Sequence, residues 1–454
     1  MERIKENSPS ILLFPWLGFG HVSPYLALAK KLSKMNFHIY FLSTPIILKS
    51  IKETLDKKNS SYNNLSIQLV EFHLPYLHEL PPHYHTTNDL PPHLNSTLIQ
   101  AFQMASSKFP SIIETLKPNL IIYDGFQPWV ATMASSCNIH AIMFYVSSTS
   151  GLVYLYHQFL HGTSNLTSLP FSSLYLHDYE IKKLDIKPIK PRDEKAFAYV
   201  VLKSFEQSHY IVFLNTCREI EGKYIDYVST IGKKELIPIG PLIREATIGE
   251  EEDWGTIQSW LDKKDQLSCV YVSFGSESFL SKQEIEEIAK GLELSKVNFI
   301  WTIKFPKGVN TTIEEMVPQG FLESTKWKGM VIEGWVPQSQ ILNHSSIGGF
   351  VTHCGWNSML ESMSFGIPII AMPMNHDQPL NSRLVEELGI GVEILRGENG
   401  KIMKEEVAKG IRKVVEEKTR IQVNLKAMQL SEKIKLKGEK ATDEEVKKLL
   451  KLLC

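Results

Sequence analysis

The sequence is poor in the features that mark secreted, membrane-spanning or nucleic-acid-binding proteins. Its 454 residues include five cysteines, an odd number without zinc-type spacing, which favours reduced thiols over disulfides or a metal site. Lysine and arginine (49) balance aspartate and glutamate (50), so no positive excess is available to bind a phosphate backbone. No apolar run reaches the roughly 18–20 residues of a membrane-spanning helix, and the polar start, interrupted at Pro15 and Gly18, does not resemble a secretion signal. We therefore expect a cytoplasmic protein with no nucleic-acid partner and no stable membrane insertion.

Short repeats are also absent, whereas two long α/β patterns are present. Apolar runs typical of strands alternate with amphipathic stretches of helical period, and an acidic stretch, residues 245–253, separates the two patterns. This alternation predicts two α/β domains with parallel sheets. The expected strands are 11–15, 37–43, 120–123, 140–145, 269–274, 299–303, 330–333, 349–352 and 368–372.

Two irregular segments interrupt the first pattern. Residues 73–95 carry five histidines among five prolines. A metal site is one interpretation of them, but no tight ligand spacing supports it, which favours a mobile loop at a cleft and leaves open whether the loop covers a substrate. Residues 157–195 are expected to form a second insertion. The Lys/Glu-rich tail, 401–454, is typical of solvated helix faces.

A histidine lies at the first expected strand-to-helix turn, Gly18-Phe19-Gly20-His21-Val22-Ser23. The turn lacks the third glycine of a dinucleotide-binding fingerprint, and no acidic residue follows the second strand, so a nicotinamide cofactor is not favoured. Asp124 follows the strand 120–123 and is expected to meet His21 at the same edge of the sheet. Because no Gly-x-Ser-x-Gly nucleophile elbow occurs, the pair indicates a general base acting on a substrate hydroxyl.

The densest set of candidate residues lies in the 44-residue stretch from Trp335 to Gln378. Within it, His353-Cys354-Gly355-Trp356-Asn357-Ser358 follows an expected strand and opens a helix, so backbone N–H groups and polar side chains can bind a diphosphate. The flat Trp335 ring can stack on a base, and Glu361 can accept hydrogen bonds from ribose hydroxyls. Asp377 and Gln378 can bind the hydroxyls of a sugar. Together these residues predict a nucleotide-sugar site.

These motifs resemble those of the plant family-1 UDP-sugar-dependent glycosyltransferases. The 44-residue stretch is similar to the signature box of that family, and the similarity covers essentially the whole chain, including 14–24, 124–129, 239–242 and 273–276. The resemblance implies a GT-B fold, with two Rossmann-like domains whose parallel sheets face each other across a cleft. It assigns residues 1–245 to the acceptor and 246–435 to the UDP-sugar. It also implies that the last helix, about 436–454, packs back on the first domain.

The resemblance implies roles for individual residues. His21 matches the catalytic base of the family and Asp124 its partner. The uracil and ribose would be bound by Trp335, the backbone of Val336, Gln338 and Glu361. The diphosphate and the transferred sugar would be bound by Ser276, His353, Gly355, Trp356, Asn357, Ser358, Asp377 and Gln378. Contacts with the acceptor are expected from Phe19, Phe126, Tyr145 and Asn375.

The implied reaction is a single inverting displacement in which His21 removes the acceptor proton and UDP leaves. No prosthetic group and no metal are expected, and the sequence contains no Asp-x-Asp motif. Gln378 favours UDP-glucose as co-substrate. Residues 15–24, 85–92 and 214–224 most resemble the sugar–sugar branch-forming members of plant secondary metabolism, which extend triterpenoid or flavonoid glycosides.

We therefore expect a monomeric enzyme that adds glucose to a sugar hydroxyl of a preformed glycoside through a β-1,6 or β-1,2 link. An O-glucosyltransferase acting directly on an aglycone is the nearest alternative. A non-catalytic sugar-nucleotide-binding protein would be expected to lack His21 or Asp124. A GT-B epimerase or phosphorylase lacks support, because the nucleotide-sugar motif is specific and no cofactor lysine is evident.

Overall fold

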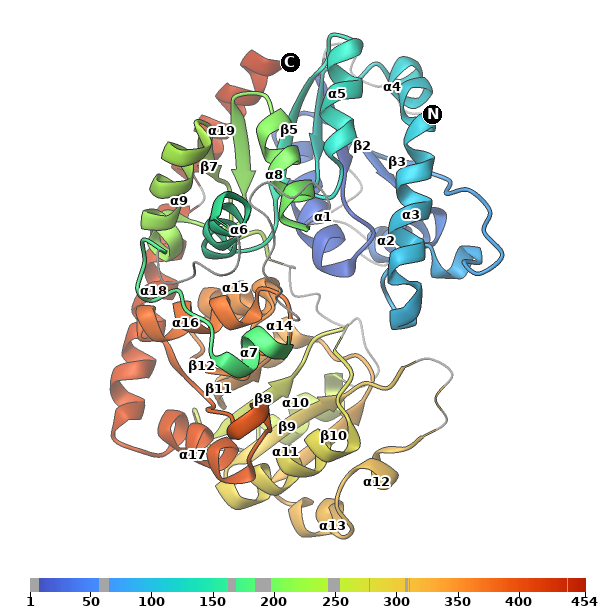
Figure 1. The fold of residues 1–454 in the computed structure, drawn as a ribbon. Coiled ribbons are helices and arrows are strands. Elements are labelled where there is room, and N and C mark those ends of the chain that lie inside the picture. Colours follow the sequence, from blue (N-terminus) through green and yellow to red (C-terminus); the bar gives the residue numbers. More distant parts are fainter. Residues whose placement is uncertain are drawn as a thin grey trace. The chain divides into compact units, whose positions relative to one another are not determined.

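The computed structural model describes residues 8–56, 65–161, 169–183, 197–243, 254–276, 278–306, 309, 311–438 and 440–454. The chain divides into two compact units (Figure 1). The first comprises Met1–Gly162, Ile189–Ile243 and Lys437–Cys454, and the second comprises Thr163–Pro188 and Arg244–Leu436. The acidic stretch 245–253, which separates the two sequence patterns, lies outside the described residues.

A seven-stranded parallel sheet forms the centre of the first unit, in the order β3-β2-β1-β4-β5-β6-β7. Helices cover both faces of such a sheet, so its inner strands are continuous apolar runs, such as Ile-Leu-Leu-Phe at 11–14. The strands are β1 (Ser10–Phe14), β2 (His38–Ser43), β3 (Ile67–Glu71), β4 (Leu120–Tyr123), β5 (His140–Tyr145), β6 (Ile211–Leu214) and β7 (Glu235–Pro238).

The direction of strand addition reverses between β1 and β4. The chain crosses from β1 through α1 to β2 on one side and from β4 through α5 to β5 on the other, so right-handed crossovers place these helices on opposite faces. Ligands of open α/β sheets bind at such a reversal, beyond the carboxyl ends of the strands. The helices of this unit are α1 (Phe19–Lys34), α2 (Pro45–Asp56), α3 (Asn95–Met104), α4 (Phe109–Leu116), α5 (Pro128–Ser136), α6 (Thr149–His161), α8 (Phe197–Gln207), α9 (Arg218–Gly232) and α19 (Lys440–Leu453), with 3₁₀ turns η1 (Pro82–Tyr84), η2 (Pro92–Leu94) and η3 (Ala105–Lys108).

The second unit repeats this architecture with a six-stranded parallel sheet in the order β10-β9-β8-β11-β12-β13. Here the reversal lies between β8 and β11, and it again leaves two adjacent strand ends for a ligand. The strands are β8 (Cys269–Ser273), β9 (Asn298–Ile303), β10 (Gly329–Glu333), β11 (Ile347–Thr352), β12 (Ile369–Ala371) and β13 (Gly391–Glu393).

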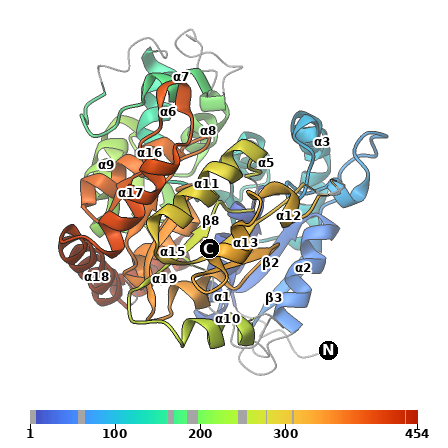
Figure 2. The same cartoon turned by 90° about the horizontal axis from the view of Figure 1, so that it is seen from below.

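Local sequence explains how the helices of the second unit begin and pack. Ser281 and Glu284 form a capping box at the start of α11, each side chain bonding the backbone N–H of the other. Gly291 lets α11 approach α17, because a Cβ atom there would lie 2.6 Å from Val407; both views show these helices adjacent (Figure 1, Figure 2). The helices are α7 (Asp178–Lys183), α10 (Trp254–Leu261), α11 (Lys282–Ser295), α12 (Ile313–Met316), α13 (Phe321–Thr325), α14 (Gln338–Leu342), α15 (Trp356–Phe365), α16 (Gln378–Leu388), η5 (Glu398–Gly400), α17 (Lys404–Val415) and α18 (Thr419–Gly438).

Two segments belong to the unit opposite to the one that sequence order suggests. Helix α7 lies between two stretches of the first unit along the chain but groups with the second unit, and α19 groups with the first. The Nζ atom of Lys31 on α1 lies 2.5 Å from Oδ1 of Asp443 on α19, and it also donates to the carbonyl of Ile239 at 3.4 Å. The last helix is therefore attached to the helix that carries His21.

All nine expected strands are present, and the fold class is confirmed. Four further strands, β3, β6, β7 and β13, were not predicted. Within 73–95, residues 85–87 are anchored to the turn after β1: Thr86 donates to the carbonyl of Leu17 through its hydroxyl, at 3.1 Å, and Thr87 through its N–H, also at 3.1 Å. Parts of 157–195, namely 162–168 and 184–195, lie outside the described residues. In the described part of the chain, no helix combines the length and the apolar character needed to span a membrane.

Candidate active site

His21 and Asp124 meet at the strand reversal of the first unit. Phe14 of β1 pairs with Tyr123 of β4, so the segments that follow these strands leave the sheet side by side. Nδ1 of His21 lies 2.8 Å from Oδ2 of Asp124. The carboxylate is almost inaccessible, at 2% exposure, whereas the imidazole retains 21%. The structure thus brings together the two residues that the sequence predicts to meet, and it leaves the histidine accessible.

The surroundings of Asp124 hold its carboxylate toward the imidazole. Its Oδ1 accepts the N–H of Phe126 at 3.3 Å, and its own N–H donates to Oε1 of Gln127 at 3.2 Å. A carboxylate at Nδ1 favours the tautomer with the proton on that atom, which leaves the lone pair on Nε2. It also stabilises the imidazolium that forms when Nε2 takes up a proton. The pair is therefore suited to general-base chemistry at Nε2.

Aromatic side chains lie beside this pair. The His21 and Phe126 rings meet in a T-shaped contact, with centroids 5.3 Å apart, and Trp16 stacks on Phe126 at 5.1 Å. Phe19, on the first turn of α1, is exposed, and Tyr145 is the buried last residue of β5. Three of the four expected acceptor contacts therefore belong to the first unit, where Phe19 follows β1, Phe126 follows β4 and Tyr145 ends β5. Asn375 belongs to the second unit.

Glu221 supports this region, although the sequence interpretation assigned it no role. It is fully buried, and its carboxylate accepts the N–H groups of Thr149, at 3.0 Å, and Ser150, at 2.8 Å. It therefore caps the first turn of α6 and fixes the loop that follows Tyr145. Its position among ordinary helix residues contains no local signal of this function.

In the second unit, His353 lies between two glycines at the strand reversal. A Cβ atom at Gly275, which follows β8, would lie 2.7 Å from Nε2 of His353, and one at Gly355 would lie 2.5 Å from the same atom. Such distances leave no room for a side chain. Cys354, with φ of 66°, makes the turn that leads into α15, and Gly355 is the N-cap residue of that helix. The expected diphosphate ligands Asn357 and Ser358 lie on its first turn, and Ser276 follows Gly275.

The imidazole of His353 is electrically neutral at physiological pH. Burial, and secondarily the charge of His376, lowers the pKa of His353 to about 4. The first turn of α15 has N–H groups without intrahelical partners and a positive helix end. A diphosphate at this place would therefore meet the helix end and neutral donors, without an excess of cationic side chains.

This pKa shift predicts how stability depends on pH. The pKa of a histidine in an unfolded chain is about 6.5. Between that pH and about pH 4, the unfolded chain therefore binds a proton at this residue that the folded protein does not bind. The contribution of His353 to the free energy of unfolding is therefore full above pH 6.5 and falls as the pH drops toward 4. We expect His353→Gln to reduce the fall in melting temperature between pH 7.5 and 5.0. The exposed His93→Gln variant is the control, and parallel curves for wild type and His353→Gln would contradict the assignment.

The residues expected to hold the nucleoside also come together. Nε2 of Gln338, the first residue of α14, donates to Oε2 of Glu361 at 2.8 Å and to Oγ of Ser358 at 3.2 Å. Trp335 precedes them on the loop after β10 and is 44% exposed. Val336 is buried, and its carbonyl accepts the N–H of Gln338 at 2.8 Å. A flat ring, a carboxylate and an amide thus lie next to α15.

The residues expected to bind the sugar lie at the start of α16. Oε1 of Gln378 accepts the N–H groups of Met374, at 2.9 Å, and Asn375, at 2.8 Å. These bonds fix the orientation of the amide group, so Nε2 is the atom with which Gln378 can donate to a sugar hydroxyl. Nδ2 of Asn381 bonds both Oδ2 of Asp377, at 3.2 Å, and the carbonyl of Cys354, at 3.0 Å. Asn381, which sequence reasoning missed, therefore joins the sugar-binding residues to the turn that precedes α15; the buried Trp356 opens that helix. Among the described residues, no group of three or more His, Cys, Asp or Glu is arranged to hold a metal ion.

Comparisons with known proteins find two family models that together match most of the chain. Residues 256–444 match the family model described as UDP-glucoronosyl and UDP-glucosyl transferase, and residues 7–244 match that of the N-terminal domain of glycosyltransferases. The chain is 49% identical to a mogroside IIIx synthase of Siraitia grosvenorii, over 98% of both chains. It is 44% identical to a beta-D-glucosyl crocetin beta-1,6-glucosyltransferase of Gardenia jasminoides, over 97% of this chain and 98% of the relative.

Other comparisons extend the range of relatives. A flavanone 7-O-glucoside 2''-O-beta-L-rhamnosyltransferase of Citrus maxima is 44% identical over 100% of this chain and 99% of its own. Among solved structures, the chain is similar in fold to UGT73P12 of Glycyrrhiza uralensis, crystallised with glycyrrhetinic acid 3-O-monoglucuronide. The TM-score is 0.84 and the identity 22%, over 98% of this chain and 96% of that one.

Proposed function

We propose, from the fact that this chain belongs to the UDP-glucoronosyl and UDP-glucosyl transferase family, that it adds glucose from UDP-glucose to a sugar hydroxyl of a preformed plant glycoside. The chain is a UDP-glycosyltransferase with the GT-B fold. The observation that carries the proposed chemistry is the 2.8 Å contact between Nδ1 of His21 and Oδ2 of Asp124. This pair can act as a general base on an acceptor hydroxyl, and the proposed reaction uses that hydroxyl, not a protein side chain, as the nucleophile.

The proposed reaction is one displacement. Nε2 of His21 accepts the proton of the acceptor hydroxyl, and the oxygen forms a bond to the anomeric carbon of glucose as the bond from that carbon to the diphosphate breaks. UDP leaves with the electron pair, the anomeric configuration inverts, and the proton on His21 is later released to solvent. Asp124 stabilises the imidazolium, and the N–H groups at the start of α15, with His353, stabilise the charge that develops on the diphosphate.

The acceptor class rests on the relatives. The Gardenia and Citrus relatives are named for transfer to beta-D-glucosyl crocetin and to a flavanone 7-O-glucoside, with 1,6 and 2''-O regiochemistry respectively. We therefore retain a glycoside acceptor and a β-1,6 or β-1,2 link. Gln378 supports glucose as the transferred sugar, although the Citrus relative is named for rhamnose. We also propose, from the sequence alone, that the enzyme acts as a monomer in the cytoplasm.

An acceptor panel tests the proposal. Purified protein is offered UDP-glucose together with a matched aglycone, its monoglucoside and its diglucoside, in a triterpenoid series and in a flavonoid series. We expect kcat/KM for a glucoside to exceed that for its aglycone by at least about 100-fold, because a site that hydrogen-bonds sugar hydroxyls strongly rejects an analogue without them. NMR of the product identifies the linkage, and UDP-rhamnose and UDP-glucuronate serve as donor controls. Robust glucosylation of the bare aglycone but not of its glucosides would establish the aglycone enzyme instead.

A further inference from the structure

Helix α7 is joined to α16 by a buried ionic cluster that the proposed reaction does not use. Both guanidinium nitrogens at the tip of Arg383 are engaged. Nη2 donates to Oε1 and Oε2 of Glu180, at 2.9 and 2.7 Å, and Nη1 donates to Glu393 and to Oγ of Ser382. The three charged side chains are between 1% and 4% exposed. Glu180 lies on α7, Arg383 on α16 and Glu393 at the end of β13.

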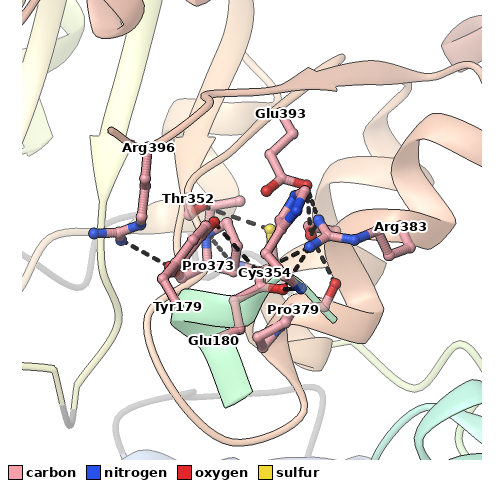
Figure 3. Close-up of polar contacts among 11 residues, drawn as sticks. Tyr179, Glu180, Thr352, Cys354, Pro373, Pro379, Arg383, Glu393 and Arg396 are labelled. Atoms are coloured by element: carbon pink, nitrogen blue, oxygen red, sulfur yellow. Dashed lines mark hydrogen bonds and ion pairs between the residues drawn. The ribbon is translucent and has the colours of Figure 1, made fainter. Parts of the chain in front are cut away.

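A second contact joins α7 to the loop in front of α16. Nη2 of Arg396 donates to the carbonyl of Pro373 at 2.8 Å, and Nη1 donates to the carbonyl of Gly400 at 3.1 Å. The Tyr179 ring packs against Gly400, where a Cβ atom would lie 2.9 Å from Cδ2 of the ring. Figure 3 shows Tyr179 and Glu180 of α7 between Arg396 on one side and Arg383 on the other. One short helix therefore contacts both arginine-centred networks.

These two networks bracket the residues expected to bind the transferred sugar. Arg396 holds the loop at Pro373, and Arg383 holds α16 one to two turns beyond its first residue. Between these points lie Asp377 and Gln378, and Gln378 closes the loop by accepting two of its N–H groups. A displacement of α16 along or about its axis would move both side chains together. The geometry of the sugar site therefore depends on what holds α16.

Charge makes this dependence strong. The cluster contains one positive and two negative side chains in a nearly water-free place. Loss of the Glu180 charge weakens the acceptor of the buried Nη2 of Arg383, and loss of the Arg383 fork leaves two buried carboxylates without their donors, so in either case the surroundings must move. The two ends of the guanidinium fork also fix orientation, because Nη2 binds both carboxylate oxygens of Glu180 while Nη1 of the same planar group binds Glu393. A buried contact of this kind specifies position more than it adds stability.

We propose that Glu180 is a positioning residue for the transferred sugar: by binding Arg383 it docks α7 against α16 and so sets the orientation of Asp377 and Gln378. This inference rests on the proposed function, since it takes those two side chains as ligands of the sugar. The uridine and diphosphate are expected on Trp335, α14 and α15, not on α16. Recognition of glucose and recognition of UDP are therefore separable, and Glu180 acts on the first.

The test compares UDP with UDP-glucose in Glu180→Gln, which keeps the size of the side chain and removes its charge. We expect calorimetry to give a dissociation constant for UDP within about twofold of wild type and one for UDP-glucose about 10-fold higher, with kcat lower by about 10- to 100-fold, as a misplacement of roughly 1 Å produces. Arg383→Lys keeps the charge without the fork and should show the same split, while Glu180→Asp should recover part of it. A general loss of folding would weaken both ligands equally.

Asp226→Asn is the matched control, because it breaks another bidentate pair, with Arg218 at 2.8 and 2.9 Å, that is exposed and belongs to the first unit. It should leave both affinities unchanged. Equal changes for UDP and UDP-glucose in Glu180→Gln and Arg383→Lys, or no change in either variant, would overturn the inference. Calorimetry needs no acceptor, so this test can be read even if the acceptor panel fails. If the wild-type protein binds UDP-glucose no more tightly than UDP, Asp377 and Gln378 do not contribute to glucose binding, and the inference fails.

Discussion

Replacement of His21 by alanine is expected to lower kcat by about 10²- to 10⁴-fold, the usual contribution of a positioned general base. The reason is geometric: Asp124 occupies Nδ1 at 2.8 Å, so Nε2 is the atom of this pair that can take the acceptor proton, and alanine provides none. Steady-state kinetics with the best glycoside of the panel measures the loss. Calorimetry with UDP should show unchanged binding, because the nucleotide-sugar residues belong to the second unit.

Two comparisons make the result specific. Asp124→Asn keeps the shape of the partner but removes the charge that stabilises the imidazolium, so it should also reduce kcat, and the double variant should be little worse than His21→Ala because the residues act as one unit. The exposed His140, on the strand next to β4, provides the control variant His140→Ala, which should retain wild-type kinetics. Turnover that survives His21→Ala would remove this residue from the role of base.

The second large effect is expected at Gly355. A Cβ atom there would lie 2.5 Å from Nε2 and 2.9 Å from Cε1 of His353, so alanine must displace the ring from its place beside the first turn of α15. The backbone itself, at φ −61° and ψ 135°, suits alanine, and the effect therefore comes from the clash alone. We expect Gly355→Ala to weaken UDP binding by about 10- to 100-fold, corresponding to the loss of one or two hydrogen bonds to a charged group.

Calorimetry measures this loss, and a thermal unfolding curve monitors the accompanying overpacking, which costs about 1–3 kcal/mol in a tight site. Gly255→Ala is the control: that position is on α10 with no atom within 4 Å of the added Cβ, and alanine favours the helix. The double variant His353→Ala with Gly355→Ala should regain the melting temperature but not the affinity. Wild-type affinity in Gly355→Ala would show that the His353 ring does not contribute to UDP binding.

The fold was predictable where strands are long and apolar, and less so elsewhere. β1 and β4 are completely buried or nearly so, and their runs stand out from flanking polar residues. The edge strand β3, Ile-Gln-Leu-Val-Glu, carries exposed polar side chains, and β13 has three residues. β6 is a four-residue buried run shortly after α8, and periodicity cannot distinguish so short a run from part of a helix.

The same distinction applies to the site. His21 and Asp124 lie 103 residues apart, yet Asp124 directly follows β4 and His21 lies on the first turn of α1, the helix after β1. The pairing of β1 with β4 therefore brings them together. Glu180 and Arg383 lie 203 residues apart, and neither follows such a rule. Asp-Tyr-Glu-Ile-Lys-Lys at 178–183 is typical of a surface helix, and only the packing of tertiary structure makes its glutamate a buried partner.

The chain passes between its two units four times, because 163–188 and 437–454 each belong to the unit opposite to their neighbours in sequence. During synthesis, the helix that contacts α1 leaves the ribosome after residues 244–436 of the second unit, so α19 can join the first unit only once that stretch has been made. The same route restricts recombination between relatives. A single crossover near residue 245 would join α7 of one parent to α16 of the other, and α19 of the second to α1 of the first. A chimera that exchanges sugar specificity should therefore take residues 163–188 from the parent that supplies the second unit, and residues 437–454 from the parent that supplies the first.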